Sequence, residues 1–151
     1  MNIKKLLQKI VENQRESHMT ITLSSNTTVS ISATWTYVIV PFNSTISRTG
    51  LFANSTITSN SIVIPKDGIY RLSGIGTSQN GTYFRIDVND NPVENGGGIQ
   101  PNTSYTSVPI PVAIKKLNSG DKVCVKVCKS GSANPLVGGG GYTRLLVEKI
   151  G

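Results

Sequence analysis

The stretch DKVCVKVC at residues 121–128 alternates valines with lysines and cysteines, and this alternation decides the class of fold. Successive side chains of an extended strand point to opposite faces of a sheet. Val123, Val125 and Val127 would therefore line one face, which is the pattern of a strand with one side packed on a core. Outward from this stretch, the same period of two recurs in most of the chain from Met19 onward.

Segments of this kind are rich in Val, Ile, Thr and Tyr and are separated by clusters of Asn, Gly, Pro and Asp. The predicted strands are 19–24, 28–32, 34–42, 55–64, 68–77, 82–89, 104–115, 121–128 and 141–149. Short strands in succession predict an all-β jelly-roll sandwich of about 8–10 antiparallel strands, preceded by a short N-terminal helix. Segment 34–42 is apolar on both faces, so we expect a subunit interface to cover its second face. Gly138–Gly141 is expected to form a flexible loop.

The N-terminal residues follow a different pattern, with strong helix formers and no Gly, Pro or Thr before residue 18. Apolar side chains recur there at the spacings of one helical face, at Ile3, Leu6, Leu7 and Ile10. A helix this short is marginal alone in water, so we expect it to anchor the chain on a partner or to mediate trimerisation. The expected organisation is an anchoring or trimerisation helix over residues 1–18 and a jelly-roll head domain over residues 19–151.

The composition excludes a coiled-coil rod, a zinc module and a disulfide scaffold, because 15% of the 151 residues are charged, 32 are Ser or Thr, and there are only two Cys and one His. The net charge of +7 falls mainly on residues 115–151, which carry +5, while residues 20–114 are neutral. Five of the six lysines in this last third lie close together with no aromatic residue among them, at Lys115, Lys116, Lys122, Lys126 and Lys129. Nucleic-acid-binding modules usually add aromatic side chains to a basic face, so we expect no nucleic-acid partner. We expect a solvated or partner-facing basic edge, with a patch for phosphate or anionic glycan as the alternative.

Five short motifs appear in order between residues 35 and 149. They are VPFN at 40–43, IPKDGIY at 64–70, the segment 81–93, LNSGDKV at 117–123, and GY before LLV at 141–147. In order and spacing they resemble the trimeric jelly roll of complement-type globular heads (complement 1q) and tumour necrosis factor relatives. The resemblance implies a homotrimer of jelly rolls. The chain departs from complement heads in having no collagen stalk.

Bacterial viruses use similar small trimeric jelly rolls at the tips of capsid fibres and tail fibres. The sequence has no secretory signal and no stretch long enough to insert into a membrane. We therefore predict a non-enzymatic homotrimeric protein on the virion surface of a phage, made in the host cytoplasm. It would attach to host-cell glycans and bind another virion structural protein through its helix. The alternative is a secreted or spore-surface complement-like recognition or adhesion module, and a glycan depolymerase is a third candidate.

Aromatic side chains are the candidates for glycan contact, because an aromatic ring offers a large apolar face beside a polar group. They are Trp35, Tyr37, Tyr83 and Tyr105. The competing interpretation places most of these rings in the core or in a subunit interface. The sequence has no phosphate-loop or nucleophile motif, and its single histidine, His18, lies at the helix–strand junction. We therefore expect no enzymatic activity and no cofactor.

Cys124 and Cys128 would lie about 13 Å apart on one strand, at about 3.3 Å per residue. That distance is beyond the reach of a disulfide, so we expect free thiols, with a bond between subunits as the alternative. Three carboxylates, Asp87, Asp90 and Glu94, lie in and after a predicted strand. They do not match the spacing of a helix-loop-helix calcium loop, and we expect no metal there. A weak calcium site at these carboxylates is the alternative.

Overall fold

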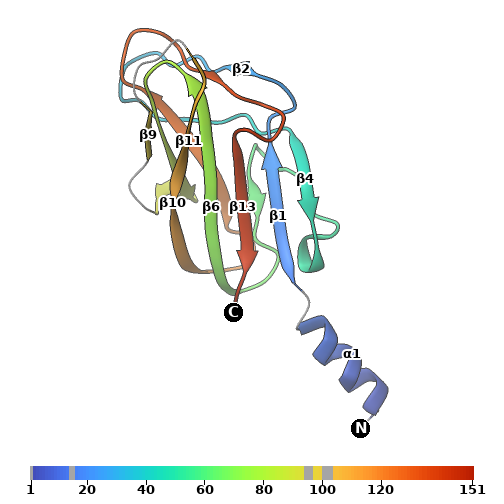
Figure 1. Ribbon diagram of the computed structural model, residues 1–151. Helices are drawn as coiled ribbons and strands as arrows, with labels where there is room; N and C mark the ends of the chain where they lie inside the picture. Colours follow the sequence, from blue (N-terminus) through green and yellow to red (C-terminus); the bar gives the residue numbers. More distant parts are fainter. Residues whose placement is uncertain (1, 14–15, 94–96, 100–103) are drawn as a thin grey trace.

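The computed structural model describes residues 2–13, 16–93, 97–99 and 104–151. Within these ranges it contains one α-helix, α1 (Ile3–Asn13), and a sandwich of two antiparallel sheets (Figure 1). Over the described residues there are thirteen strands, of which five are only two residues long. The all-β jelly roll with a short N-terminal helix is therefore confirmed.

Sheet A has seven strands, and its order is β2-β12-β6-β13-β1-β4, with β10 also paired to β6. Its strands are β1 (Ser17–Thr22), β2 (Thr27–Thr28), β4 (Ser44–Arg48), β6 (Gly68–Gln79), β10 (Thr106–Leu117), β12 (Leu136–Val137) and β13 (Arg144–Lys149). The first long strand, β1, pairs with the last, β13, so the two ends of the sandwich sequence are joined in one layer.

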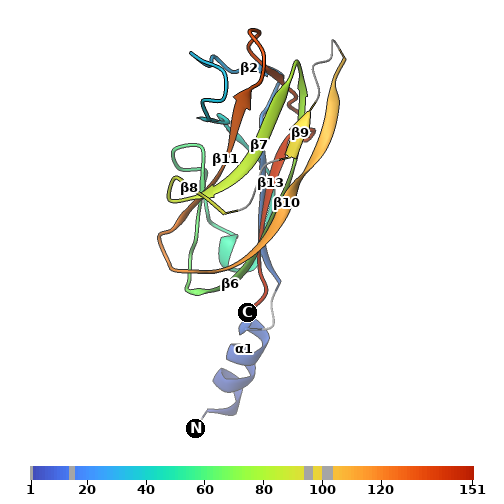
Figure 2. The same cartoon turned by 90° about the vertical axis from the view of Figure 1, so that its left-hand side faces the viewer.

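Sheet B has six strands in the order β3-β11-β7-β8, with β5 on β11 and β9 on β7. Its strands are β3 (Val38–Ile39), β5 (Ile62–Val63), β7 (Thr82–Val88), β8 (Asn91–Pro92), β9 (Gly97–Ile99) and β11 (Lys122–Lys129). Figure 2 shows β6, β10 and β13 in one layer and β7 and β11 in the other. A single 3₁₀ turn, η1 (Gly50–Phe52), follows β4.

The core lies between the two sheets and is filled by the inward side chains of the long strands. Fully buried members include Met19, Ile21, Tyr70, Leu72, Phe84, Ile86, Val123, Val125, Val127, Leu145 and Val147. The valine face of residues 121–128 is thus on the core, as the alternation predicts. A Cβ at Gly76 would lie 2.2 Å from the Phe84 ring, so glycine lets this ring pack against β6 from the opposite sheet.

Three predicted strands are much shorter than the sequence pattern indicates. Only Thr28 of the predicted strand 28–32 lies in a strand, β2, because the backbone N–H of Ile31 donates to the Asn134 side chain instead. Segment 34–42 is reduced to Val38–Ile39, since Trp35 has a φ of +62°. Segment 55–64 is reduced to Ile62–Val63.

The structure also contains strands that the sequence pattern did not predict. The longest is β4, whose residues STISR have one large apolar side chain, Ile46, and that side chain is exposed. An edge strand with no buried apolar face has no period-two signal to detect. Strands β8, β9 and β12 are two or three residues long, which is too short for a period of two to be recognised in the sequence.

The run Gly138–Gly141 is a tightly bonded loop, and the expectation of a flexible one is wrong. Each of its four N–H groups donates a hydrogen bond to another part of the chain. The acceptors, in order, are Thr77 O at 2.8 Å, Asn26 Oδ1 at 2.9 Å, Leu23 O at 2.8 Å and Thr22 Oγ1 at 3.0 Å. Glycine serves here because the backbone at Gly140 and Gly141 has positive φ and Gly139 lies against the backbone of Ser25.

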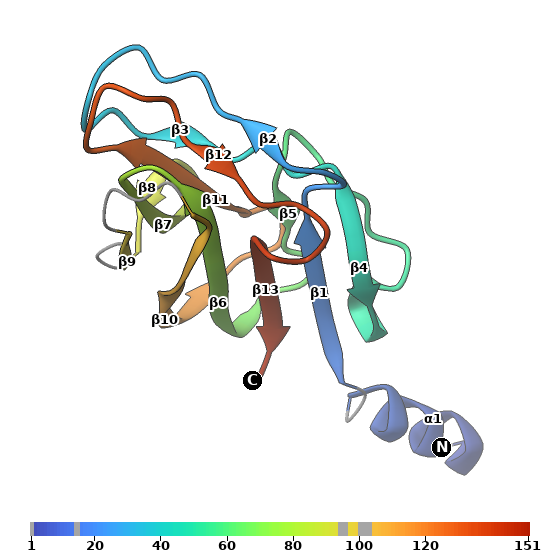
Figure 3. The same ribbon diagram turned by 45° about the horizontal axis from the view of Figure 1, so that its top comes forward.

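Helix α1 stands clear of the sandwich, beside the end at which β1 begins and the chain terminates (Figures 1 and 3). The Asn2 side chain accepts hydrogen bonds from the N–H groups of Lys4 and Lys5 and so caps the helix. Ile3, Leu6 and Leu7 are 70%, 42% and 57% exposed, while the side chain of Ile10 lies outside the described residues. Within the described ranges, no helix has the length and apolarity needed to cross a membrane.

Candidate recognition site

The outer face of sheet B, the face turned away from the core, carries a continuous set of polar and aromatic side chains. Strand register places them in opposed pairs on β7 and β11: Tyr83 with Cys128, Arg85 with Lys126, and Asp87 with Cys124. They share this face because the residues between them, Phe84, Ile86 and the three valines, point into the core. This face is the candidate site.

Asp87 is the centre of a charge network on this face, and its side chain is fully buried. Its Oδ1 lies 2.8 Å from Arg85 Nε, and its Oδ2 lies 3.3 Å from Lys126 Nζ. Lys126 also reaches Asp90, with Nζ 3.2 Å from Oδ1. Burial lowers the pKa of Lys126, but its ion pairs with Asp90 and Asp87 raise it by more, so the pKa lies above its ordinary value.

These contacts bear on the alternative of a weak calcium site at Asp87, Asp90 and Glu94. Both aspartates are engaged by the Lys126 ammonium, and Glu94 lies outside the described residues. Among the residues that the structure describes, no three His, Cys, Asp or Glu side chains are grouped so that they could hold a metal ion. Asp87 is therefore bound as the partner of two cationic side chains.

Tyr37 lies on the same face and is fixed in place. The Arg85 guanidinium carbon is 3.8 Å from the centre of the Tyr37 ring, a cation–π contact. Burial, followed by a hydrogen bond with Cys128, raises the pKa of Tyr37 to about 12. This chain thus covers part of the second face of segment 34–42 with its own Arg85.

Trp35 is the exposed aromatic of this region. Its side chain is 59% exposed, and its ring centre lies 5.2 Å from that of Tyr83 at an angle of 38° between the planes. The Trp35 N–H donates a 2.9 Å hydrogen bond to the Lys129 carbonyl at the end of β11. The structure thus brings Trp35, Tyr37 and Tyr83 together.

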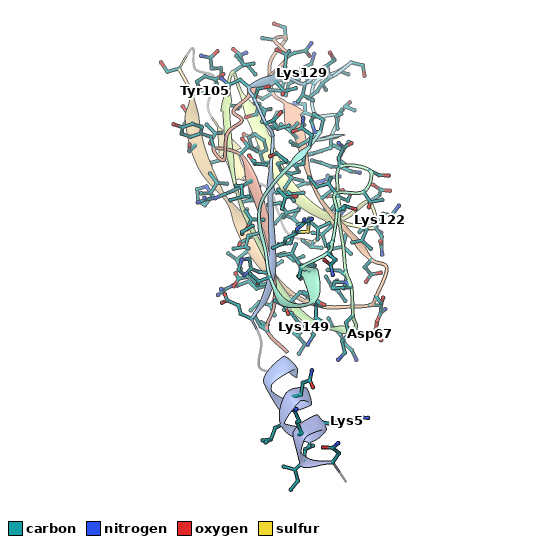
Figure 4. All side chains as sticks on the ribbon, turned by 90° about the vertical axis from the view of Figure 1, so that its right-hand side faces the viewer. Lys5, Asp67, Tyr105, Lys122, Lys129 and Lys149 are labelled. Atoms are coloured by element: carbon teal, nitrogen blue, oxygen red, sulfur yellow. The ribbon has the colours of Figure 1, made fainter. Side chains whose placement is uncertain are left out.

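The fourth predicted aromatic, Tyr105, is not part of this group. It precedes β10 in sheet A and lines a separate hollow of about 290 Å³ with Tyr142 and Thr77. Figure 4 shows Tyr105 and Lys129 at the end of the sandwich away from α1, with Lys149 and Asp67 at the end near it.

The lysines of the C-terminal third do not form one basic edge, so that expectation is wrong. Lys115 and Lys116 lie on β10 in sheet A, while Lys122, Lys126 and Lys129 lie on β11 in sheet B. Lys129 is buried, and its ammonium donates to Asn134 Oδ1 at 3.3 Å and to a backbone carbonyl. The charge of this third is therefore distributed over both sheets and partly enclosed.

Both cysteines are free and buried on the outer face of sheet B. Burial, followed by the nearby Asp87 carboxylate, raises the pKa of Cys124 to about 11. Such a thiol is protonated at neutral pH and is a poor nucleophile. Cys124 therefore acts as a packing residue beneath the polar side chains.

The outer face of sheet A, turned away from the core on the other side of the molecule, carries exposed apolar side chains. They include Ile46, Ile69, Val112, Ile114 and Tyr142, which are 49%, 44%, 57%, 61% and 68% exposed. Two open hollows of about 750 and 510 Å³ on this face share Ile46, Ile75 and Arg144 as lining residues. The sequence held a signal for this face, since Ile69 and Ile75 occupy the alternate positions of β6 that do not face the core.

Two stacked antiparallel sheets with β1, β13, β6 and β10 adjacent in one layer define a jelly roll of the complement 1q and tumour necrosis factor type. The globular domain of zebrafish complement 1qA is similar with a TM-score of 0.61 at 15% identity, covering 89% of this chain and 96% of that one. Murine APRIL at pH 5.0 is similar with a TM-score of 0.58 at 16% identity, covering 89% of this chain and 99% of that one. Eiger TNF from S. frugiperda is similar with a TM-score of 0.61 at 11% identity, covering 91% of this chain and 94% of that one.

At these identities the likeness establishes the fold, and the predicted resemblance to this jelly roll is confirmed. No protein-family model matches the sequence, and no curated protein matches it.

Proposed function

We propose that this protein is a non-enzymatic homotrimer on a phage virion surface, at a capsid-fibre or tail-fibre tip, where it attaches to glycans of the host cell. The observation that carries the proposal is the exposed apolar outer face of sheet A. Exposed apolar side chains that share one face of a domain mark an association surface, and on this face they lie around the Arg71–Glu148 ion pair. A domain with one face for association and a second, polar and aromatic face is suited to recognition.

A homotrimer would bury the outer face of sheet A. Val112 and Ile114 lie on β10 and Ile46 on β4, so the exposed apolar side chains extend over both edges of this sheet. The resemblance to complement 1q and tumour necrosis factor jelly rolls supports three copies as the number. The apolar side chains of α1, at Ile3, Leu6 and Leu7, would then meet near one axis or seat on another virion structural protein.

Oligomeric state tests this part of the proposal. Light scattering of the full chain at micromolar concentration is expected to give three times 16.1 kDa. Ile114→Lys is expected to shift the mass towards that of a monomer, because it places a charge in the buried contact. Leu51→Lys is the matched control, since Leu51 is 45% exposed on η1, outside the proposed contact, and should leave the trimer intact. A wild-type monomer would refute the homotrimer.

The virion location needs a separate test. Antibodies against the chain are expected to label the capsid or tail fibres of the particles that contain it, and mass spectrometry of purified particles should detect it. Capsid, portal and tail genes beside its own gene would support the proposal. A collagen-like gene in that position, with no label on particles, would favour the secreted or spore-surface recognition module instead.

A further inference from the structure

Trp35 is held in a backbone conformation that large side chains rarely adopt. Its φ of +62° lies in the left-handed region, a conformation that costs free energy for residues other than Gly, Asn or Asp. The conformation is maintained by the hydrogen bond from Trp35 N to Lys129 O. Strained residues of this kind cluster at ligand-contact sites, so the exposed indole is a candidate for contact with something outside the chain.

The surroundings of Trp35 indicate what it contacts. Residues 32–36 are all exposed, and apart from the indole they carry only hydroxyl groups or a methyl group. The facing loop, residues 130–134, is likewise Ser, Gly, Ala and Asn. Over the part of the chain that the structure describes, the other large exposed apolar side chains lie on α1, on sheet A or its connecting loops, on η1 and at Ile150. A sugar ring needs one aromatic face for its C–H groups and hydrogen-bonding groups around it, and the exposed indole among small hydroxyl and amide side chains provides both.

The charges nearby indicate a neutral sugar. Arg85 and Lys126 are both bound to Asp87, and Lys126 is bound to Asp90 as well. The buried Lys129 ammonium is held by Asn134 and a carbonyl. Among the described residues of β7 and β11 next to Trp35, the cations are Arg85, Lys126 and Lys129, and each is bonded to another group of the chain. None of these three is therefore free to bind a carboxylate or sulfate.

We infer that the exposed face of the Trp35 indole, backed by Tyr83, is the stacking surface for a neutral pyranose. Tyr37 does not take part, because Arg85 covers its ring, and Tyr105 does not, because it lies in a separate hollow on sheet A. This inference rests on the proposed attachment to glycans and specifies both the residue and the class of sugar.

A glycan array probed with the full-length protein tests the inference. The neutral probes are oligosaccharides of hexoses and N-acetylhexosamines, and the anionic probes are sialylated glycans and heparin. The wild-type chain is expected to bind neutral probes, and Trp35→Asn is expected to weaken that binding by about tenfold or more. Asn tolerates positive φ, so this variant removes the indole without straining the backbone.

Tyr105→Ala is the matched control, because it removes an exposed aromatic ring from the other location and should leave binding unchanged. Neutral binding that survives in Trp35→Asn, or binding restricted to anionic probes, would overturn the inference while leaving glycan attachment standing. A wild-type protein that binds no glycan on the array would overturn the inference and the glycan part of the proposed function together.

Discussion

Asp87 and Lys126 lie on neighbouring strands, with the carboxylate Oδ2 3.3 Å from the ammonium nitrogen, and the Asp87 side chain is fully buried. Arg85 approaches the same carboxylate from two residues earlier on β7, with Nε 2.8 Å from Oδ1. One buried anion therefore holds two cationic side chains in place. Since Arg85 also lies over Tyr37, this anion positions the ring as well.

Removing the anion is expected to destabilise the fold. Asp87→Ala leaves the Arg85 and Lys126 charges beside each other without their shared partner, and we expect the free energy of unfolding to fall by about 3 kcal/mol. Asp90→Ala is the comparison, because Asp90 is 85% exposed and its pair with Lys126 contributes less than about 1 kcal/mol. Urea unfolding of the two variants measures both values. Equal losses of unfolding free energy in the two variants would contradict the view that burial makes the Asp87 ion pairs contribute more than the Asp90 pair.

The backbone strain at Trp35 predicts an order of stability for two variants. Trp35→Ala and Trp35→Asn both remove the contact with Tyr83, but only Asn tolerates a φ of +62° well. Trp35→Asn is therefore expected to be more stable than Trp35→Ala by about 1 kcal/mol. Thermal unfolding of the pair checks the order, and a less stable Asn variant would contradict a strained backbone at this position.

The thiols are expected to be unreactive in the folded protein. With a pKa of about 11, roughly one Cys124 thiol in a thousand is ionised at pH 8, and both cysteines are buried. A thiol-specific chromogenic reagent at pH 8 should label neither group until guanidinium unfolds the chain, after which it should label both. Ser119→Cys supplies the control, because position 119 is exposed in the turn before β11 and should react at once. Two equivalents of rapid labelling in the native wild type would contradict the buried arrangement.

Acid is expected to weaken the turn between β10 and β11. The Asn118 N–H and then the Asn89 side chain donate to the Asp121 carboxylate and hold its pKa below the ordinary value of 3.8. A lowered pKa means that the ionised form stabilises the fold above the unfolded-state pKa, and that this stability is lost as pH falls through the folded-state pKa. Asp121→Asn should cost about 1 kcal/mol at pH 7.

The pH dependence distinguishes this account from a general loss of packing. The difference in stability between wild type and Asp121→Asn should shrink as the pH is lowered below 3.8 and disappear once Asp121 is protonated. Thermal melts between pH 2 and pH 7 measure it. A difference that stays constant across that range would exclude the carboxylate as its source.

The long strands could be predicted from the sequence because one of their faces is buried. In residues 68–77 and 82–89, buried side chains alternate with more exposed ones over most of the length. The first segment lies within β6, and the second matches β7 to within one residue. The short strands could not be predicted in the same way, since side-chain bonds and local turns set where they end. Asn134 bonding Ile31 and the positive φ of Trp35 are examples of such tertiary or backbone effects.

The candidate site was only partly predictable. Composition identified Trp35, Tyr37 and Tyr83 as aromatic candidates, but it could not separate them from Tyr105, because their grouping depends on the register of β7 and β11. The Arg85–Asp87–Lys126 network was not predicted. Two of its members lie on β7 and the third on β11, 39 residues further along the sequence than Asp87, so no local spacing reveals it.

Helix α1 and the terminal Gly151 both lie at one end of the sandwich, while Lys129, to which Trp35 is bonded, lies at the other (Figures 1 and 4). A flexible tag added after Gly151 would emerge beside Ile69, which accepts and donates backbone bonds with this terminus. Capture on a surface through such a tag would therefore orient every molecule with its indole facing the solution. Because the attachment point and the indole lie at opposite ends of the sandwich, weak sugar binding can be measured on a sensor surface without obstructing Trp35.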